Sequence, residues 1–187
     1  MSLMHAILGF LRRAPQTGYA LKNERFDKSV AYFWPADQTQ IYKTLEKLVE
    51  NGFATTEIEI QSDRPNRKIY SISKSGKEEL ERWLRDSTEP AVTRDPLLVQ
   101  LFFSDYINAD DLLEVLTKAK SYHEKHLEKL QAIHINTIAR CTTREELGAR
   151  LTLELGLKSK QAYLEWLDQA SDAVTSMQRK HLRAKHK

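Results

Sequence analysis

The stretch SDRPNRKIYSIS, residues 62–73, joins a basic, turn-forming segment to a run that alternates polar and apolar residues. This alternation has the period of two that is typical of a β-strand. The preceding run FATTEIEI, residues 53–60, alternates in the same way, so the two runs predict a hairpin closed by QSDRPN. Because the loop and the start of the second arm hold Arg64, Arg67 and Lys68 around a proline, we expect a stiff, positively charged hairpin tip.

Helical patterns surround the hairpin. The first helix is expected from Ser2, as a capping residue, to Pro15, and the second from about Thr17 until shortly before Trp34. A further helix follows the hairpin over SKSGKEELERWL, residues 73–84. The residues expected to face the core are Leu3, Ile7, Phe10 and Leu11 in the first helix and Leu80, Trp83 and Leu84 in the last.

A third helix lies directly before the hairpin and has the clearest signals. Asp37 and Gln40 have the spacing of a capping box, and Gly52 is placed to end the helix in a left-handed conformation. The expected inner face is the apolar stripe Ile41, Thr44, Leu45, Leu48 and Val49. The residues left on the exposed side near the start of the helix are Gln38, Thr39, Tyr42 and Lys43.

Three helices followed by a two-stranded hairpin is the order of a winged helix-turn-helix, in which the third helix enters the major groove and the hairpin is the wing. Amide and hydroxyl groups of Gln38, Thr39 and Gln40 could read base edges, while Tyr42, with Lys43 beside it, could donate to a phosphate. The wing would add phosphate contacts from Arg64, Asn66, Arg67 and Lys68. The alternative is that the charged loop is only solvated.

A proline-containing segment, DSTEPAVTRDP at residues 86–96, separates this part from an almost wholly helical second half. We therefore expect a mainly α fold with a small α+β wing, made of two domains. Residues 1–88 would form the winged helix-turn-helix, and residues 89–187 a helical hairpin that serves for dimerisation. Its long helices are expected at about 109–139 and from about 143 to beyond 174.

The last of these helices carries two neighbouring apolar stripes. They are Leu147, Leu151, Leu155, Ala162 and Trp166, and Leu153, Leu157, Leu164, Leu167 and Val174. Such a face is too wide for one partner helix, so it predicts a homodimer in which a second copy covers the remainder. A two-fold dimer in turn predicts an operator with inverted-repeat symmetry. The alternative is a monomer whose second half packs onto its first.

Composition permits nucleic-acid binding without requiring it, because 187 residues carry a net charge of only +3 and the pI is ≈ 8.9. Hydrophobic residues make up 41% and charged residues 29%, as in soluble globular proteins. No run approaches the roughly 18 apolar residues of a membrane span. The opening MSLMHAILGFLRR lacks the features of a signal peptide. A single cysteine, Cys141, excludes an intramolecular disulfide and fits a reducing cytoplasm.

Residues with catalytic or metal-binding potential are few. His123 and His126 lie three residues apart, with His134 further along, a spacing that could bind a transition metal. No further ligand completes the set, so we expect surface or interface histidines and no metal or other cofactor. Cys141 and a histidine could form a nucleophile pair, but no third group accompanies them, and we expect no catalytic activity. Phe102, Phe103 and Tyr106 are expected in the core or between domains.

Several motifs of the first domain resemble the PadR family of bacterial transcriptional regulators. They are HAILGFL (5–11), TGYAL (17–21), QIYKTLEKLVENGF (40–53) and DRPNRKIYSISKSGKEELERWL (63–84). AYFWPADQTQIY (31–42) and PNRKIYSI (65–72) are most similar to the branch that contains the virulence regulator AphA. The second half resembles the family only in its pattern.

The resemblance implies that Tyr19, Gln40, Tyr42, Arg67 and Lys68 face DNA and that the C-terminal helices form the dimerisation domain. Members of the family include sensors of phenolic and other aromatic compounds. The resemblance therefore also raises a small aromatic effector as a partner. Its pocket would lie near Trp34, Trp83, Phe102 and Phe103.

We therefore expect a cytoplasmic, dimeric transcriptional regulator that binds a specific double-stranded DNA sequence and acts without catalysis. The alternative is a winged-helix scaffold that binds another protein. Thr39 and Lys43 depart from the pattern of AphA-like chains, so the operator sequence stays open. Activation or repression, the target genes and the role of the basic end RKHLRAKHK, residues 179–187, are not indicated by these patterns.

Overall fold

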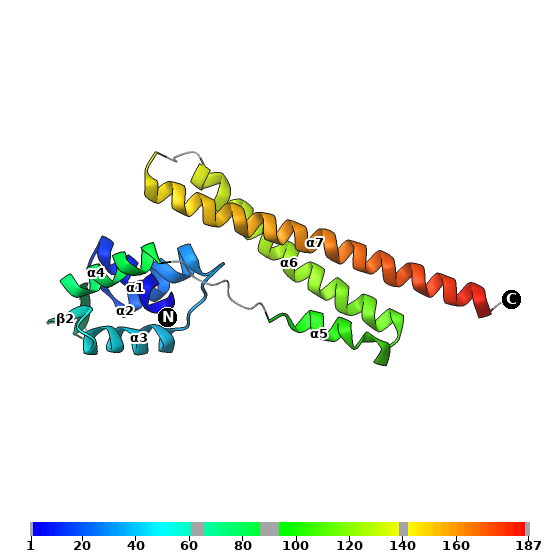
Figure 1. The fold of residues 1–187 in the computed structure, drawn as a ribbon, viewed down its shortest axis with the longest axis horizontal. Helices are drawn as coiled ribbons and strands as arrows, with labels where there is room; N and C mark the ends of the chain where they lie inside the picture. The colour runs from blue at the N-terminus through cyan, green and yellow to red at the C-terminus, as the bar shows by residue number, and fades with distance from the viewer. Residues whose placement is uncertain (1, 61–65, 87–93, 139–141, 186–187) are drawn as a thin grey trace. The chain divides into compact units, whose positions relative to one another are not determined.

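The computed structural model describes residues 2–60, 66–86, 94–138 and 142–185 (Figure 1). The chain divides into two compact units, Met1–Pro90 and Ala91–Lys187. Each unit has a buried hydrophobic cluster of its own. The two units are therefore described one at a time.

The first unit contains a short antiparallel sheet and helices that cover it. Its elements are α1 (Ser2–Arg13), β1 (Gln16–Thr17), α2 (Gly18–Ala20), the π-helix η1 (Leu21–Val30), α3 (Gln38–Glu50), β2 (Ala54–Glu59), β3 (Arg67–Ile72) and α4 (Lys74–Arg85). The strand order is β1-β3-β2, and both pairings are antiparallel. This is the topology of a winged helix-turn-helix, as the sequence predicts.

Two local features of this unit differ from the expectation. The sheet has three strands rather than two, because Gln16 and Thr17 pair with Tyr70 and Ile69. A strand of two residues is too short to show an alternating pattern. Most of the predicted second helix is a π-helix, whose wider turns are seen in the bond from the Ala31 amide to the Phe26 carbonyl at 2.9 Å. Sequence periodicity does not distinguish such turns from α-helical ones.

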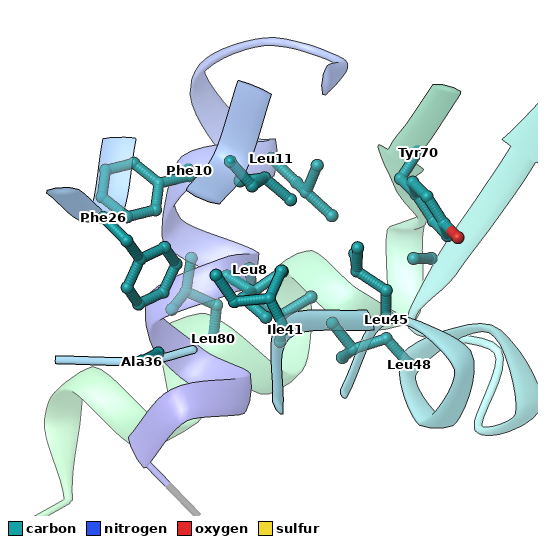
Figure 2. Close-up of a cluster of buried hydrophobic side chains, with 13 residues drawn as sticks. Leu8, Phe10, Leu11, Phe26, Ala36, Ile41, Leu45, Leu48, Tyr70 and Leu80 are labelled. Carbon is teal, nitrogen blue, oxygen red and sulfur yellow. The ribbon is translucent and has the colours of Figure 1, made fainter. Parts of the chain in front are cut away.

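The core of this unit fixes the rotation of α3 about its axis (Figure 2). Ile41, Leu45 and Leu48 are all 0% exposed and meet side chains from α1, η1 and α4. The rings of Phe10 and Phe26 meet edge to face at 5.4 Å between centroids. Because the buried stripe takes one side of α3, the opposite side faces outward, as expected.

The ends of α3 also form as predicted. The Gln40 amide donates to Asp37 Oδ1 at 2.7 Å, and the Asp37 amide donates to Gln40 Oε1 at 3.0 Å, which completes the capping box. Gly52 follows the helix with φ 70°, the left-handed conformation that glycine adopts without strain.

The helix α4 packs on α1 with one departure from expectation. Leu80 is buried, and the Trp83 ring stacks on His5 with centroids 4.4 Å apart. Leu84, predicted to face inward, is 66% exposed. Trp83 rather than Leu84 takes the last position against α1.

The start of α4 is clamped to the turn that precedes the sheet. Ser73 and Ser75 both donate their hydroxyls to the Gly52 carbonyl, at 2.6 and 2.7 Å. The Ser73 amide donates to the Phe53 carbonyl at 3.0 Å. A Cβ added to Gly76 would lie 2.0 Å from that same carbonyl oxygen, so only glycine fits there. The wing, α3 and α4 are joined tightly at this point.

The second unit is helical. It consists of α5 (Pro96–Phe102), the 3₁₀ turn η2 (Ser104–Tyr106), α6 (Ala109–Ile138) and α7 (Arg144–Lys185). Lys120 pairs with Asp168 at 2.5 Å and Gln178 donates to Asp110 at 2.9 Å, so α6 and α7 form an antiparallel hairpin, as predicted. The short helix α5 was not expected. Its signals are Asp95, which accepts from the Leu97 amide, and Pro96 in the first turn.

The second of the two predicted stripes of α7 is largely buried, whereas the first is exposed except at its C-terminal end. There Trp166 is partly buried and packs against the cluster of Leu97, Leu116 and Leu167. Leu153, Leu157 and Leu167 are buried at 2%, 9% and 0% exposure. The exposed fractions of Leu147, Leu151 and Leu155 are 37%, 53% and 67%. Phe102, Phe103 and Tyr106 are also exposed, at 79%, 55% and 82%, so they lie outside the core of the second unit, and their expected place between the domains stays a prediction. They lie at the end of α5 and in η2, beyond the part that contacts α6 and α7.

His123 lies in the seam between α6 and α7. Its Nδ1 accepts from Lys160 Nζ at 3.1 Å, and its ring lies 4.2 Å from that of Tyr163. Burial lowers the pKa of His123 below its ordinary value of 6.5, and the Lys160 ammonium lowers it further. Burial also lowers the pKa of His126. Tyr163 donates to Asp95 at 2.5 Å, and burial followed by this bond raises its pKa to about 12.

We predict that the second unit loses stability as the pH falls below about 6.5. In the unfolded chain His123 has its ordinary pKa, whereas in the folded protein its pKa is lowered. As the pH falls, the unfolded state therefore binds a proton before the folded state does, and this favours unfolding. The measurement is the urea midpoint between about pH 7.5 and about pH 5.5. His123→Phe keeps a ring against Tyr163 and should weaken the dependence; an identical dependence in this variant would contradict the assignment to His123.

We also predict that Gly76→Ala lowers the free energy of unfolding of the first unit by about 1–3 kcal/mol or more, because the added methyl meets backbone. Gly9→Ala is the matched control, since nothing lies within 4 Å of an added Cβ there. In a helix that change should stabilise by about 0.5–1 kcal/mol. Thermal melting of both variants measures the difference, and equal melting temperatures would contradict it.

Candidate nucleic-acid interface

The outer side of α3 presents polar groups near its start. With the inner side held by Ile41 and Leu45, the start of the helix points its side chains to solvent. The exposed residues are Gln38, Thr39, Gln40 and Lys43, and Tyr42 is half-buried. Amides, a hydroxyl and an ammonium are groups that bind base edges and phosphates.

Gln40, predicted to contact a base, also forms part of the capping box of α3. Its side-chain oxygen accepts from the Asp37 amide at 3.0 Å, and its carbonyl accepts from Thr44 Oγ1 at 2.7 Å. The two-bond contact of a glutamine with adenine uses both the amide oxygen and the amide nitrogen. In the capping box the side-chain oxygen of Gln40 already accepts one hydrogen bond, whereas the box does not use its nitrogen. Gln38 and Thr39 have no such task in the capping box.

Tyr42 joins α3 to the start of α2. A Cβ added to Gly18 would lie 2.7 Å from Tyr42 Cζ and 3.1 Å from its hydroxyl, so the tyrosine ring rests on the glycine backbone. Thr17 caps α2 by accepting from the Ala20 amide at 3.1 Å. Tyr19, 64% exposed, follows directly. The predicted contact residues Tyr19 and Tyr42 are thereby brought to one edge of the unit.

Tyr70 joins the wing to the same edge. It is 2% exposed and pairs in the sheet with Gln16 and Thr56. Burial raises its pKa, and the neighbouring Tyr42 and Glu46 of α3 raise it further. Figure 2 shows the Tyr70 ring at the border of the core, near Leu45 of α3.

The two described cations of the wing lie on opposite faces of the sheet. Lys68 belongs to the face of Tyr70, and its ammonium lies 5.5 Å from the centroid of that ring. Arg67, one residue earlier, points to the other face, where its cross-strand partner is Glu59. Both side chains are exposed, as is that of Asn66. Arg64 lies outside the described residues. The predicted cluster is therefore split, with Lys68 on the side of α3.

Comparison with known proteins agrees with these features. The sequence matches the family described as PadR-like transcriptional regulators over residues 7–82 and the one described as virulence activator alpha C-term over residues 93–175. The probable transcriptional regulator Rv1176c of Mycobacterium tuberculosis is 32% identical over 187 residues, which cover 93% of this chain and 98% of that protein. The chain belongs to the PadR-like family of transcriptional regulators.

Other PadR-like proteins match along nearly the whole chain. The negative transcriptional regulator PadR of Bacillus subtilis is 28% identical over 171 residues, which cover 89% of this chain and 93% of that protein. Its crystal structure in complex with operator DNA has a TM-score of 0.81 at 27% identity, and the match covers 93% of this chain and 99% of that one. Its complex with p-coumaric acid has a TM-score of 0.77 at 26% identity, covering 94% and 99%.

The Vibrio cholerae virulence activator AphA is the third relative. Its structure has a TM-score of 0.77 at 28% identity, and the match covers 94% of this chain and 99% of that one. The resemblance to the PadR family and to AphA, expected from the motifs, is confirmed.

Sequence reasoning missed two residues that organise this PadR-like interface. Gly18 was read only as part of a helix start, and Tyr70 only as an apolar position of a strand. A glycine directly after a capping threonine signals close approach of another group, but the sequence does not say that the group is Tyr42. The place of Tyr70 beside α3 depends on the sheet register.

Trp34 and Trp83, both expected near an effector pocket between the domains, have different neighbours within the first unit. Trp34 borders an open hollow of about 390 Å³ whose other lining residues are Leu3, Pro35, Gln40, Lys43 and Thr44. Trp83 stacks on His5 instead.

The histidines of α6 that the structure describes make contacts other than with metal ligands. Among the residues that the structure describes, no group of three or more His, Cys, Asp or Glu could hold a metal ion. His123 contacts Lys160 and Tyr163, and His126 lies against Tyr122 at 4.3 Å between ring centroids. Cys141 and the side chain of His134 lie outside the described part. No helix in the described ranges has the length and apolarity to cross a membrane.

We predict that Lys68→Ala makes the negative slope of log affinity against log salt shallower by about 1 for binding to a random-sequence duplex, because one phosphate contact is lost. Arg67→Ala should change the slope less, since Arg67 lies opposite Glu59 on the other face. Fluorescence anisotropy over a salt series measures both slopes.

The control for this pair is Lys77→Ala, which removes an equal charge from α4. Lys77 lies in the first turn of α4, next to the C-terminal end of α3, whereas the candidate DNA contacts of α3 lie near its start, so this slope should not change. An equal change of slope in all three variants would mean that only total charge matters.

Proposed function

We propose that this PadR-like protein binds a specific operator as a homodimer and regulates transcription by occupying it. The observation that carries the proposal is the surface on which the exposed start of α3, the Tyr42 and Gly18 contact and the wing residue Lys68 adjoin one another. A helix and a hairpin arranged in this way match a major groove and the neighbouring backbone or minor groove.

Sequence would be read by Gln38 and Thr39, with Gln40 contributing through its amide nitrogen. Phosphate contacts position the domain without carrying sequence information. They would come from Tyr19, Tyr42, Lys43, Arg64, Asn66, Arg67 and Lys68. The modest net charge of +3 means that the affinity depends on where these groups lie rather than on their number.

Dimerisation is the second part of the proposal, with residues 1–88 as the DNA-binding domain and 89–187 as the dimerisation domain. The side chains of Leu147, Leu151 and Leu155 of α7 are exposed. A second apolar surface consists of Leu98, Val99, Phe102, Phe103 and Tyr106. Exposed apolar surfaces of this kind mark interaction sites, and a second copy covers both sets at once.

A small aromatic effector is the third part. Its support is the structure of Bacillus subtilis PadR in complex with p-coumaric acid, a relative of this chain. The effector would shift the protein between states with different affinity for DNA. Because the operator is DNA and the only cysteine is Cys141, we place the protein in the cytoplasm and assign it no catalytic activity.

The alternative function is a winged-helix scaffold that binds another protein. The outer face of the sheet favours it to a degree, because Glu57 and Glu59 are exposed there beside Arg67. The salt dependence of binding distinguishes the two functions, because the affinity for DNA falls steeply as the salt concentration rises.

The test is selection of bound fragments from random duplex DNA with the full chain. We expect enriched fragments with inverted symmetry whose half-sites are about one helical turn, or a multiple of it, apart. The variant Leu151→Glu should lower the affinity for these fragments without changing the half-site sequence, because it places charge in the exposed stripe of α7.

Two measurements accompany the selection. Sedimentation of the unchanged protein should give a dimer, and the Leu151→Glu variant should shift toward monomer. Glu154→Gln on the same helix is a control that leaves the apolar stripe intact. Enriched fragments without inverted symmetry would contradict the dimer, and no enrichment at any salt concentration would contradict DNA binding.

A further inference from the structure

Two isoleucines are exposed on the first arm of the wing. Ile58, in β2, is 68% exposed, and Ile60, directly after β2, is 83% exposed. Single exposed apolar side chains are common on protein surfaces and need no explanation. These two differ because they lie two residues apart at the end of β2 and directly after it, the spacing at which residues of a strand point to the same face.

The sheet register identifies that face. Ile58 is the cross-strand partner of Lys68, and Thr56 is the partner of Tyr70. Partners in an antiparallel pair point to the same side, and so do residues two apart. Ile58 and Lys68 therefore share the face of Tyr70, which turns toward α3. The opposite face carries the paired Glu59 and Arg67 and the paired Thr55 and Ser71.

The aromatic ring of Tyr70 supports this face from the core side. Because Tyr70 is buried, the ring is a fixed base for the Lys68 ammonium, which lies 5.5 Å from the ring centroid. Ile58, across the strand from Lys68, places an apolar side chain beside that cation. The wing thus offers a narrow surface that is apolar with a positive charge at one edge.

The minor groove of DNA has the complementary character. Its walls are sugar rings, which accept apolar contact, and its rims are phosphates, which attract cations. Proteins that bind there often insert isoleucine, leucine or phenylalanine. The opposite face exposes Glu57 and Glu59 beside Arg67, and these carboxylates make it less suited to phosphates than the face of Lys68.

We propose that the Ile58, Ile60 and Lys68 face of the wing packs into the minor groove beside each half-site and that Ile58 supplies affinity independent of salt. This inference rests on the proposed DNA-binding function and names a further contact residue within it. An A·T-rich flank suits the surface, since its minor groove is narrow and lacks the guanine amino group.

The experiment compares variants of the full-length protein on a selected fragment over a salt series. Ile58→Ala with Ile60→Ala should lower the affinity roughly 5- to 30-fold, with an unchanged salt slope, because an apolar contact releases no counterions. Lys68→Ala should instead make the negative salt slope shallower by about 1. Thr55→Ala, on the other face of the same strand, is the matched control and should bind as the unchanged protein does.

A second arm changes the DNA. Replacing A·T by G·C pairs in the flank puts amino groups in the minor groove, which should weaken the unchanged protein more than the isoleucine variant. Equal losses for both would overturn the inference. So would a shallower salt slope for the isoleucine variant, like that of Lys68→Ala.

Failure of this inference differs from failure of the proposed function. If the unchanged protein binds and the isoleucine variant binds equally well, the minor-groove contact is wrong and the regulator assignment stands. If the unchanged protein selects no DNA, both the minor-groove inference and the proposed DNA-binding function are wrong. Because Ile58 and Ile60 are exposed, the variants should melt at the same temperature as the unchanged protein. A lower melting temperature would mean that another part of the protein or a second copy covers these residues, which would also overturn the inference.

Discussion

Burial of Ile41, Leu45 and Leu48 is the constraint on which the arrangement of the first unit depends. These three side chains set the rotation of α3, and that rotation decides which polar groups face outward. Each fully buried leucine or isoleucine contributes about 1.5–3 kcal/mol by leaving water. The proposed DNA-reading surface is in this sense a consequence of the core.

Short-range patterns carried the prediction of the fold. The capping box of Asp37 and Gln40, the left-handed Gly52 and the alternation of the wing are all visible within a few residues, and each appears in the structure. The strand β1 and the helix α5 were missed because two and seven residues are too short for periodicity to register. Leu84 was misplaced because burial depends on neighbours distant in sequence.

For the candidate interface, too, features set by short-range patterns could be predicted and features set by distant contacts could not. The residue types on α3 and the wing could be predicted, because polar and basic side chains at those positions have few structural roles. Their mutual placement could not, since it rests on contacts between segments far apart in the chain, such as Tyr42 on Gly18. The opposite directions of Arg67 and Lys68 were in principle available from the period of two, but their shared charge suggested a shared target.

The junction of Gly52, Phe53, Ser73, Ser75 and Gly76 has a mechanical consequence. Two hydroxyls on one carbonyl, and a glycine with no room for a side chain, leave this joint almost no freedom to bend. Because α4 is the last element of the first unit, a push on α4 is carried rigidly into the C-terminal end of α3. A movement of α4 would thus tilt α3 as a rigid body, with no change in the side chains that the start of α3 exposes.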